Sequence, residues 1–221
     1  MCNTILFDLD GTLLDTAPDL AYALNQVLTE QQQKPLPFEQ IRPWVSHGGR
    51  TMIKNGFVGC EIDIDFIHQR FLAIYSSHIA DKSVFFPDME AVLTDLESQG
   101  LQWGIVTNKP AWLTEPLLKK LNLANRSACN VSGDTLAQNK PHPAPLLYAC
   151  KLLNTTPESC VYVGDAERDV EAGKRAGMKT LIAAYGYIGT DDKPEQWGAN
   201  YILQKPMDLL TWLRNQNLIK S

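Results

Sequence analysis

The chain has 221 residues, and its 25 Asp and Glu outnumber its 20 Lys and Arg, so the formal net charge is −5. A hydrophobic fraction of 44% and a charged fraction of 20% are typical of a globular domain and exclude the disordered and fibrous classes. The acidic balance argues against nucleic-acid and membrane-surface partners. No apolar run reaches the ~18 residues of a membrane span, so we expect a cytoplasmic protein.

The cysteines do not form a recognisable framework. None belongs to a Cys-x-x-Cys pair, and all five are scattered through the chain: Cys2, Cys60, Cys129, Cys150 and Cys160. An odd number without regular spacing is typical of reduced, buried thiols rather than of disulfides. A chain of this length also buries enough surface to fold without such cross-links.

The first predicted element is a buried strand over residues 5–7, a short apolar run that ends at Asp8. A helix is predicted to follow. Asp15 or Thr16 is expected to cap its N-terminus, and Pro18 is tolerated in its first turn.

The next part of the chain shows helical spacing of its apolar residues. This spacing returns after the pair Gly48-Gly49 and again over about 63–80. No convincing strand interrupts residues 16–82. We therefore predict that this segment is an all-helical insertion.

From residue 83 onwards, strand-like and helix-like patterns alternate. Apolar runs predict four further strands at 103–106, 160–163, 180–183 and 201–203. Such alternation indicates βαβ units and a parallel sheet covered on both faces. We predict an α/β fold with a doubly wound parallel sheet. Its Rossmann-like core would comprise residues 1–15 and 83–221, and residues 16–82 would form the inserted helical cap.

Polar residues gather at the ends of the predicted strands, where open parallel sheets place their functional groups. They are Asp8, Asp10, Thr107, Asn108, Lys109 and Asp165, joined by Lys140, which is predicted to open a helix, and by Asp169 one helical turn beyond Asp165. Of these, Lys109 is expected to be exposed.

This combination of groups suggests a particular chemistry. Carboxylates in one pocket repel one another unless a cation neutralises them, and Mg²⁺ suits oxygen ligands. A hydroxyl and an ammonium can hold a phosphate. A carboxylate beside the metal can then attack phosphorus, which splits one difficult step into two.

Four segments, in order along the chain, resemble the motifs of the haloacid dehalogenase-like hydrolases. They are Asp8-Leu9-Asp10-Gly11-Thr12-Leu13, Thr107-Asn108, Lys140-Pro141 and Gly164-Asp165-Ala166-Glu167-Arg168-Asp169. Each motif alone is a weak signal, whereas all four in order are specific. The resemblance spans nearly the whole chain and includes a helical cap after the first motif.

The resemblance implies a role for each matching residue. Asp8 would be the nucleophile, and Asp10 the acid/base that protonates the leaving alkoxide and later activates water. Thr107 and Lys140 would act on the transferring phosphoryl group, and Asn108 would help to bind it.

The resemblance also implies a Mg²⁺ site. Its ligands would be Asp8, the backbone carbonyl of Asp10 and Asp165, with Asp169 as a further ligand or an orienting group. Dehalogenases of the family lack an acid at the position of Asp10, so this sequence favours hydrolysis of phosphate esters.

Three alternative functions are compatible with parts of this pattern. A phosphorylatable receiver domain would be shorter and would lack the helical insertion. A catalytically silent module would have lost one of the motif residues, and none is missing here. A phosphomutase that moves phosphate between sugar carbons shares the motifs and is separated only by its products.

The cap contains one loop suited to substrate recognition, residues 41–50. Gly48 and Gly49 allow close approach of backbone amides to an anion, and Arg50 adds a positive charge. This loop and residues 15–20 resemble the phosphoglycolate phosphatase branch, and 45–50 also resembles N-acetylmuramic acid 6-phosphate phosphatases. The expected partner is a small phosphorylated and carboxylated metabolite, handled by a monomer or homodimer. His47 receives no role.

Overall fold

A computed structural model describes residues 3–219 of the chain. Its main sheet has six parallel strands in the order β5-β4-β1-β6-β7-β8. Their bounds are β1 Thr4–Phe7, β4 Gln102–Val106, β5 Asn130–Val131, β6 Cys160–Gly164, β7 Lys179–Ala183 and β8 Tyr201–Leu203. Each strand predicted from an apolar run is present, and the parallel sheet is confirmed. The two-residue strand β5 was not predicted.

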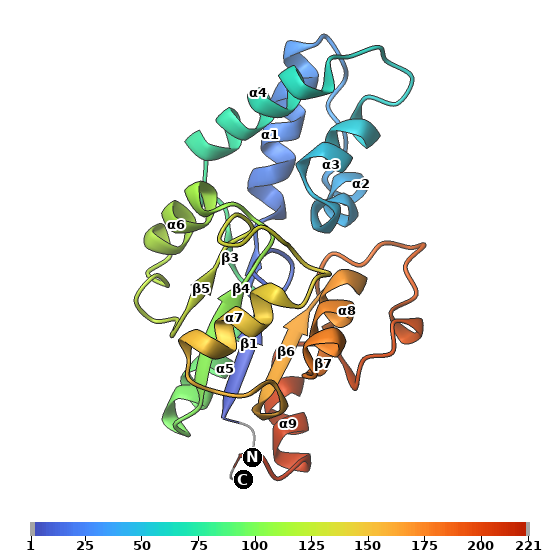
Figure 1. The fold of residues 1–221 in the computed structure, drawn as a ribbon. Helices are drawn as coiled ribbons and strands as arrows, with labels where there is room; N and C mark the ends of the chain where they lie inside the picture. Colours follow the sequence, from blue (N-terminus) through green and yellow to red (C-terminus); the bar gives the residue numbers. More distant parts are fainter. Residues whose placement is uncertain (1–2, 220–221) are drawn as a thin grey trace.

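Helices cover both faces of the sheet, as a doubly wound fold requires. They are α5 Met89–Ser98, α6 Ala111–Lys120, α7 Ala144–Leu152, α8 Glu167–Ala176 and α9 Asp208–Asn215. Side chains of β1 alternate between the two faces. Leu6 belongs to the core cluster that includes α7 and α8, which lie in front of the sheet in Figure 1. Ile5 and Phe7 belong to the larger cluster that includes α5 and α9.

The helical cap lies above the carboxyl ends of the strands (Figure 1). Its elements are α1 Ala17–Glu30, α2 Phe38–Ile41, the 3₁₀ segment η1 Arg42–His47, α3 Gly49–Gly56 and α4 Ile64–Ser77. The carboxylate of Asp63 begins α4 by accepting hydrogen bonds from the N–H groups of Asp65 and Phe66, at 3.0 and 3.1 Å. The helical character predicted for the insertion is confirmed, whereas its domain boundaries at 16 and 82 stay a prediction.

A short antiparallel ribbon joins the cap to the core. It pairs β2 Leu14–Asp15 with β3 Val84–Phe85, where the chain enters and leaves the cap. Next to it, the buried carboxylate of Asp19 accepts hydrogen bonds from the N–H groups of Lys82 and Ser83, both at 2.9 Å, and from the Ser83 hydroxyl at 2.6 Å. The incoming and outgoing segments are thus fastened to each other.

The start of α1 differs from the expectation. Thr16 is the N-cap residue, but its side chain makes no capping hydrogen bond. Its hydroxyl donates to Oδ1 of Asp10 at 2.6 Å instead. The prediction of a side-chain cap by Asp15 or Thr16 was therefore wrong, because the carboxylate of Asp10 competes for the Thr16 hydroxyl.

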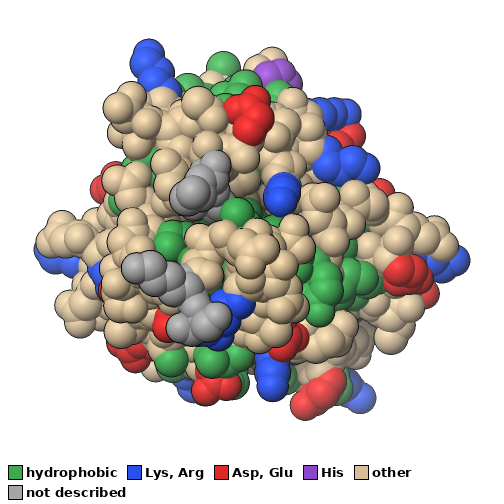
Figure 2. Space-filling model, turned by 90° about the horizontal axis from the view of Figure 1, so that it is seen from below, with side chains coloured by type: hydrophobic (Ala, Val, Ile, Leu, Met, Phe, Trp, Pro, Cys, Tyr) green, Lys and Arg blue, Asp and Glu red, His purple; other side chains and the backbone are tan. Residues whose placement is uncertain are grey.

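Among residues 3–219, no helix has the length and apolar character needed to span a membrane. The four cysteines in this range are free thiols, and Sγ of Cys150 lies 3.7 Å from Sγ of Cys160. Cys2 lies outside the described residues. On the face opposite the cap, acidic and basic side chains are interspersed around the rim rather than separated by sign (Figure 2).

Candidate active site

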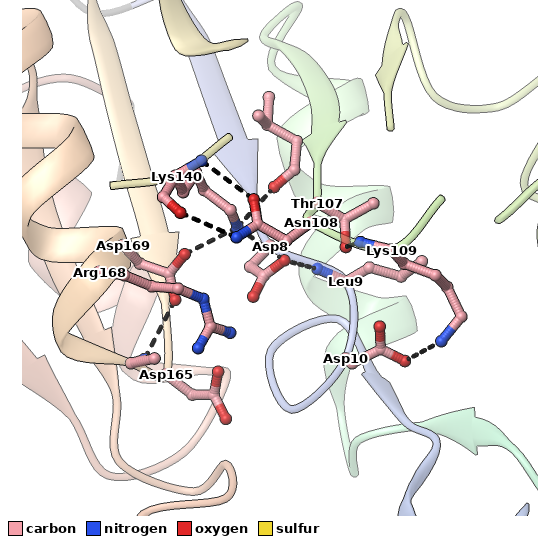
Figure 3. A network of polar contacts seen from close by, with 12 residues as sticks. Asp8, Leu9, Asp10, Thr107, Asn108, Lys109, Lys140, Asp165, Arg168 and Asp169 are labelled. Carbon is pink, nitrogen blue, oxygen red and sulfur yellow. Dashed lines mark hydrogen bonds and ion pairs between the residues drawn. The ribbon is translucent and has the colours of Figure 1, made fainter. Parts of the chain in front are cut away.

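The strand ends bring the motif residues together (Figure 3), on the side of the core that faces the cap in Figure 1. Asp8 follows the central strand β1, Thr107 follows β4 and Asp165 follows β6. Because β4 and β6 flank β1 on opposite sides, this edge is the point where the strand order reverses. Lys140 reaches the same place from the loop ahead of α7. This helix begins at Ala144, so the prediction that Lys140 opens it was wrong.

The carboxylate of Asp8 is held from one side only. Its Oδ1 accepts hydrogen bonds from the Leu9 N–H at 2.8 Å and from the Lys140 ammonium at 2.9 Å. Within the described part of the chain, Oδ2 makes no hydrogen bond. Burial raises the pKa of Asp8, whose side chain is almost fully enclosed, and the nearby Lys140 opposes that rise.

Lys140 ties several motif residues into one network. Its ammonium lies 2.9 Å from Asp8 Oδ1, 2.7 Å from Asp169 Oδ1 and 2.6 Å from the Tyr162 hydroxyl. The Asn108 side chain holds the Lys140 backbone, donating to its carbonyl at 2.9 Å and accepting from its N–H at 3.1 Å. Asn108 therefore positions Lys140, besides lining the cavity above Asp8.

The hydroxyl of Thr107 is placed to donate a hydrogen bond into the cavity above Asp8. Its hydroxyl oxygen accepts from the Lys109 N–H at 3.1 Å. The hydroxyl proton has no acceptor among residues 3–219. Since Thr107 lines the cavity above Asp8, its hydroxyl can donate to an anion bound there.

Three carboxylates form a cluster that could hold a cation. Oxygen atoms of Asp8, Asp165 and Asp169 lie within 4.8 Å of one another. Burial, reinforced by the neighbouring Asp8 and Asp169, raises the pKa of Asp165 to about 7. Its Oδ1 is buried with no hydrogen-bond partner in the described chain. A donor set made only of carboxylate oxygens, one of them unsatisfied, fits a hard divalent ion such as Mg²⁺.

Asp10 lies outside that cluster. Its Oδ1 accepts from the Thr16 hydroxyl at 2.6 Å and pairs with the Lys109 ammonium at 2.8 Å. The predicted role of its backbone carbonyl as a metal ligand stays a prediction. The expected exposure of Lys109 was wrong, because its side chain is only 7% exposed and its ammonium also lies 4.8 Å from the centre of the Tyr75 ring.

The cap contributes contacts that sequence reasoning missed. The Ser46 hydroxyl donates to Asp165 Oδ2 at 2.6 Å, and the Tyr187 N–H donates to the same oxygen at 2.9 Å. Arg168 donates from Nη1 to the Ser46 carbonyl at 2.5 Å. Arg42 reaches the core carbonyls of Gly186 and Tyr185 at 2.8 and 3.2 Å. The sequence indicated these contacts only indirectly: Arg42 and Ser46 lie in the cap loop 41–50, and Arg168 lies in the motif 164–169.

Comparison with known proteins decides the family. Residues 5–183 match the family model of the haloacid dehalogenase-like hydrolases. The chain belongs to this family. The hydrolase is 41% identical over 209 residues to an N-acetylmuramic acid 6-phosphate phosphatase of Pseudomonas putida, and 40% identical over 208 residues to a phosphoglycolate phosphatase of Xanthomonas campestris. Each of these alignments covers 94% of both chains.

The fold comparison agrees with the sequence comparison. A crystal structure of a predicted phosphoglycolate phosphatase from Haemophilus somnus matches with a TM-score of 0.85 at 26% identity, covering 96% of this chain and 97% of the other. Together with the curated relatives, it shows that the hydrolase is a phosphoric monoester hydrolase with a Rossmann-like core and a helical cap. Mg²⁺ dependence is general among the phosphatases of the family, which agrees with the carboxylate cluster.

Between cap and core, the hydrolase has a cavity of about 350 Å³ above Asp8. Gly48 and Gly49 line it, as expected for the cap loop. Much of the remaining wall is apolar and comes mainly from the cap: Leu20, Val45, Met52, Phe71, Leu72 and Leu113.

Arg50 is not part of the cavity wall. Its side chain is 57% exposed and pairs with Asp65 of α4 at 2.5 Å. The structure therefore does not bring Arg50 together with the other predicted substrate-binding residues.

Proposed function

We propose that this phosphoric monoester hydrolase transfers the phosphoryl group of a small carboxylated substrate to Asp8 and then to water. The observation that carries the proposal is the asymmetry of the Asp8 carboxylate. Oδ1 is fixed by Leu9 and Lys140, whereas Oδ2 is free beneath the cavity. A carboxylate held rigidly, with one oxygen uncommitted, is suited to nucleophilic attack.

The reaction needs two displacements at phosphorus. In the first, Oδ2 of Asp8 bonds to phosphorus, the ester P–O bond breaks, and Asp10 gives its proton to the leaving oxygen. In the second, Asp10 takes a proton from water, the water oxygen bonds to phosphorus, and the bond to Asp8 breaks. Asp10 lines the same cavity as Asp8, which supports these two roles.

Thr107, Lys140 and the divalent ion would share the charge of the phosphoryl group. Thr107 would donate its free hydroxyl proton, and Lys140 would offset negative charge while it keeps Asp8 in place. Mg²⁺, held by Asp8, Asp165 and Asp169, would supply electrostatic stabilisation of the phosphoryl oxygens.

The first substrate to test is 2-phosphoglycolate, in line with the relatives of that name. The cavity supports a second candidate, N-acetylmuramic acid 6-phosphate. Its volume of about 350 Å³ exceeds what a phosphorylated two-carbon acid occupies, and its apolar cap wall suits the acetyl and lactyl methyl groups of a larger substrate.

The test is a panel of phosphate monoesters compared by kcat/KM at saturating Mg²⁺. It should contain 2-phosphoglycolate, N-acetylmuramic acid 6-phosphate, glucose 6-phosphate and β-glucose 1-phosphate. We expect one carboxylated member to be hydrolysed with the highest kcat/KM. Isomerisation of a sugar phosphate without release of inorganic phosphate would instead identify a mutase. A flat profile over the panel would contradict a carboxylated substrate.

A further inference from the structure

The side chain of Arg168 is the feature of the cavity that the reaction scheme leaves unused. Arg168 is the second residue of α8, and its guanidinium reaches the backbone of Ser46 in the cap. It lines the main cavity and also a smaller one of about 210 Å³ on the other side of Ser46. Its guanidinium therefore lies between the core and the cap, at the wall of the main cavity.

Most N–H groups of this guanidinium make no hydrogen bond within the described residues. Nη1 donates to the Ser46 carbonyl, and this is its one hydrogen bond within residues 3–219. Nε is buried without a partner, and no carboxylate of the described chain forms an ion pair with the group. Burial lowers the pKa of Arg168, but attraction by the carboxylates of Asp169, Asp8 and Asp165 outweighs burial and keeps this pKa above its usual value. The guanidinium is therefore charged.

The other lysine and arginine side chains at the site are already committed. Lys109 is paired with Asp10, and Lys140 with Asp8 and Asp169. Arg50, which the sequence suggested for substrate binding, is paired with Asp65 on the exposed side of α3. A half-buried arginine normally pairs with an anion, and its planar fork of N–H groups matches a carboxylate. Within the described residues, no carboxylate pairs with the guanidinium of Arg168. The guanidinium is therefore available to bind an anionic ligand.

We propose that Arg168 binds the carboxylate of the substrate and sets the preference for carboxylated phosphate monoesters. This inference rests on the proposed function, since it assumes a carboxylated substrate. The phosphoryl group is expected at Asp8 and Thr107, which leaves Arg168 for the second anionic group. The bond from Arg168 to the Ser46 carbonyl fixes the direction of the fork before the substrate arrives.

The decisive experiment compares substrates that differ only in the carboxylate. One pair is 2-phosphoglycolate and ethyl phosphate. The other is N-acetylmuramic acid 6-phosphate and 3-O-isopropyl-N-acetylglucosamine 6-phosphate, in which a methyl group replaces the carboxylate of the lactyl ether. For the preferred pair, the ratio of the two kcat/KM values isolates the contribution of the carboxylate. Wild type is compared with Arg168→Met and Arg168→Lys at saturating Mg²⁺, and Arg50→Met serves as the matched control arginine.

We expect Arg168→Met to lower this ratio about ten- to a hundredfold, the size of a lost charge-assisted hydrogen bond, chiefly through a higher KM for the carboxylated member. Arg168→Lys should lower the ratio less, and Arg50→Met should leave it unchanged. If Arg168→Met does not fold, the change in ratio caused by Arg168→Lys decides.

An unchanged ratio in the Arg168 variants would overturn the inference. Equal losses on both members of the pair would mean that Arg168 serves the carboxylate cluster or the cap contact with Ser46. If wild type itself shows no preference for the carboxylated member of either pair, the proposed substrate class is wrong, and the inference is overturned with it. The wild-type ratio thus separates the two failures.

Discussion

Replacing Lys109 by Met should destabilise the protein far more than a surface lysine replacement would. The Lys109 ammonium lies 2.8 Å from Asp10 Oδ1, with side-chain exposures of 7% and 18%. Removal of one partner of a buried ion pair costs about 3–5 kcal/mol, because the remaining charge is left uncompensated. In the variant, Asp10 keeps its hydrogen bond from the Thr16 hydroxyl and some contact with water. We therefore expect a loss of stability at the lower end of this range, about 3 kcal/mol.

The assay is thermal and urea-induced unfolding. For a chain of this size, 1 kcal/mol corresponds to about 2–4 °C in Tm, so Lys109→Met should lower Tm by roughly 6–12 °C. The control is Lys54→Met, an exposed lysine in the last turn of α3, which should cost no more than about 0.5 kcal/mol.

A double-mutant cycle tests whether the pair itself is responsible. Asp10→Asn alone leaves the ammonium of Lys109 buried without its carboxylate, so it should also be costly. The double variant removes both charges and should be about 1.5–3 kcal/mol more stable than the sum of the single effects suggests. If the two effects simply add to within about 0.5 kcal/mol, the reasoning on this ion pair is refuted.

Three further outcomes follow from the site. Asp8→Asn should abolish turnover while leaving the far-UV circular dichroism spectrum unchanged, and retention of a tenth of the wild-type rate would exclude Asp8 as nucleophile. Asp165→Ala should raise the Mg²⁺ concentration for half-maximal activity, and Ca²⁺ should inhibit wild type because it accepts bidentate carboxylates; full activity in EDTA would contradict both. Gly186→Ala would place a Cβ 2.3 Å from the Gly11 carbonyl and 2.5 Å from Asp165 Cβ, so it should weaken Mg²⁺ binding in calorimetry. Unaltered affinity would show that this turn yields without moving Asp165.

The arrangement of the core could be predicted from the sequence because it follows from pattern and topology. Apolar runs identified β1, β4 and β6, and the rule on strand ends then placed Asp8, Thr107 and Asp165 at one edge. Strands of only two residues, such as β5, contain too few positions to show a pattern, and only their pairing partners define them.

The details of the site depend on contacts that no local pattern encodes. Lys109 is buried because of Asp10, which lies 99 positions away in the chain, and Ser46 is 119 positions from Asp165. The position of Arg50 beside two glycines indicated a binding loop. It did not give the rotation of α3 about its axis, which turns Arg50 towards Asp65. The cytoplasmic location and the oligomeric state stay predictions.

The fastening of the two cap connections by Asp19 has a consequence for how such proteins can diversify. The ribbon of β2 and β3 and the bonds from Asp19 to Lys82 and Ser83 keep the ends of the insertion at a fixed spacing. The entropy of closing a loop grows only slowly with its length once its ends are held. A longer, shorter or differently folded segment could therefore replace the cap between β2 and β3, while the register of the main sheet and the groups around Asp8 remain unchanged.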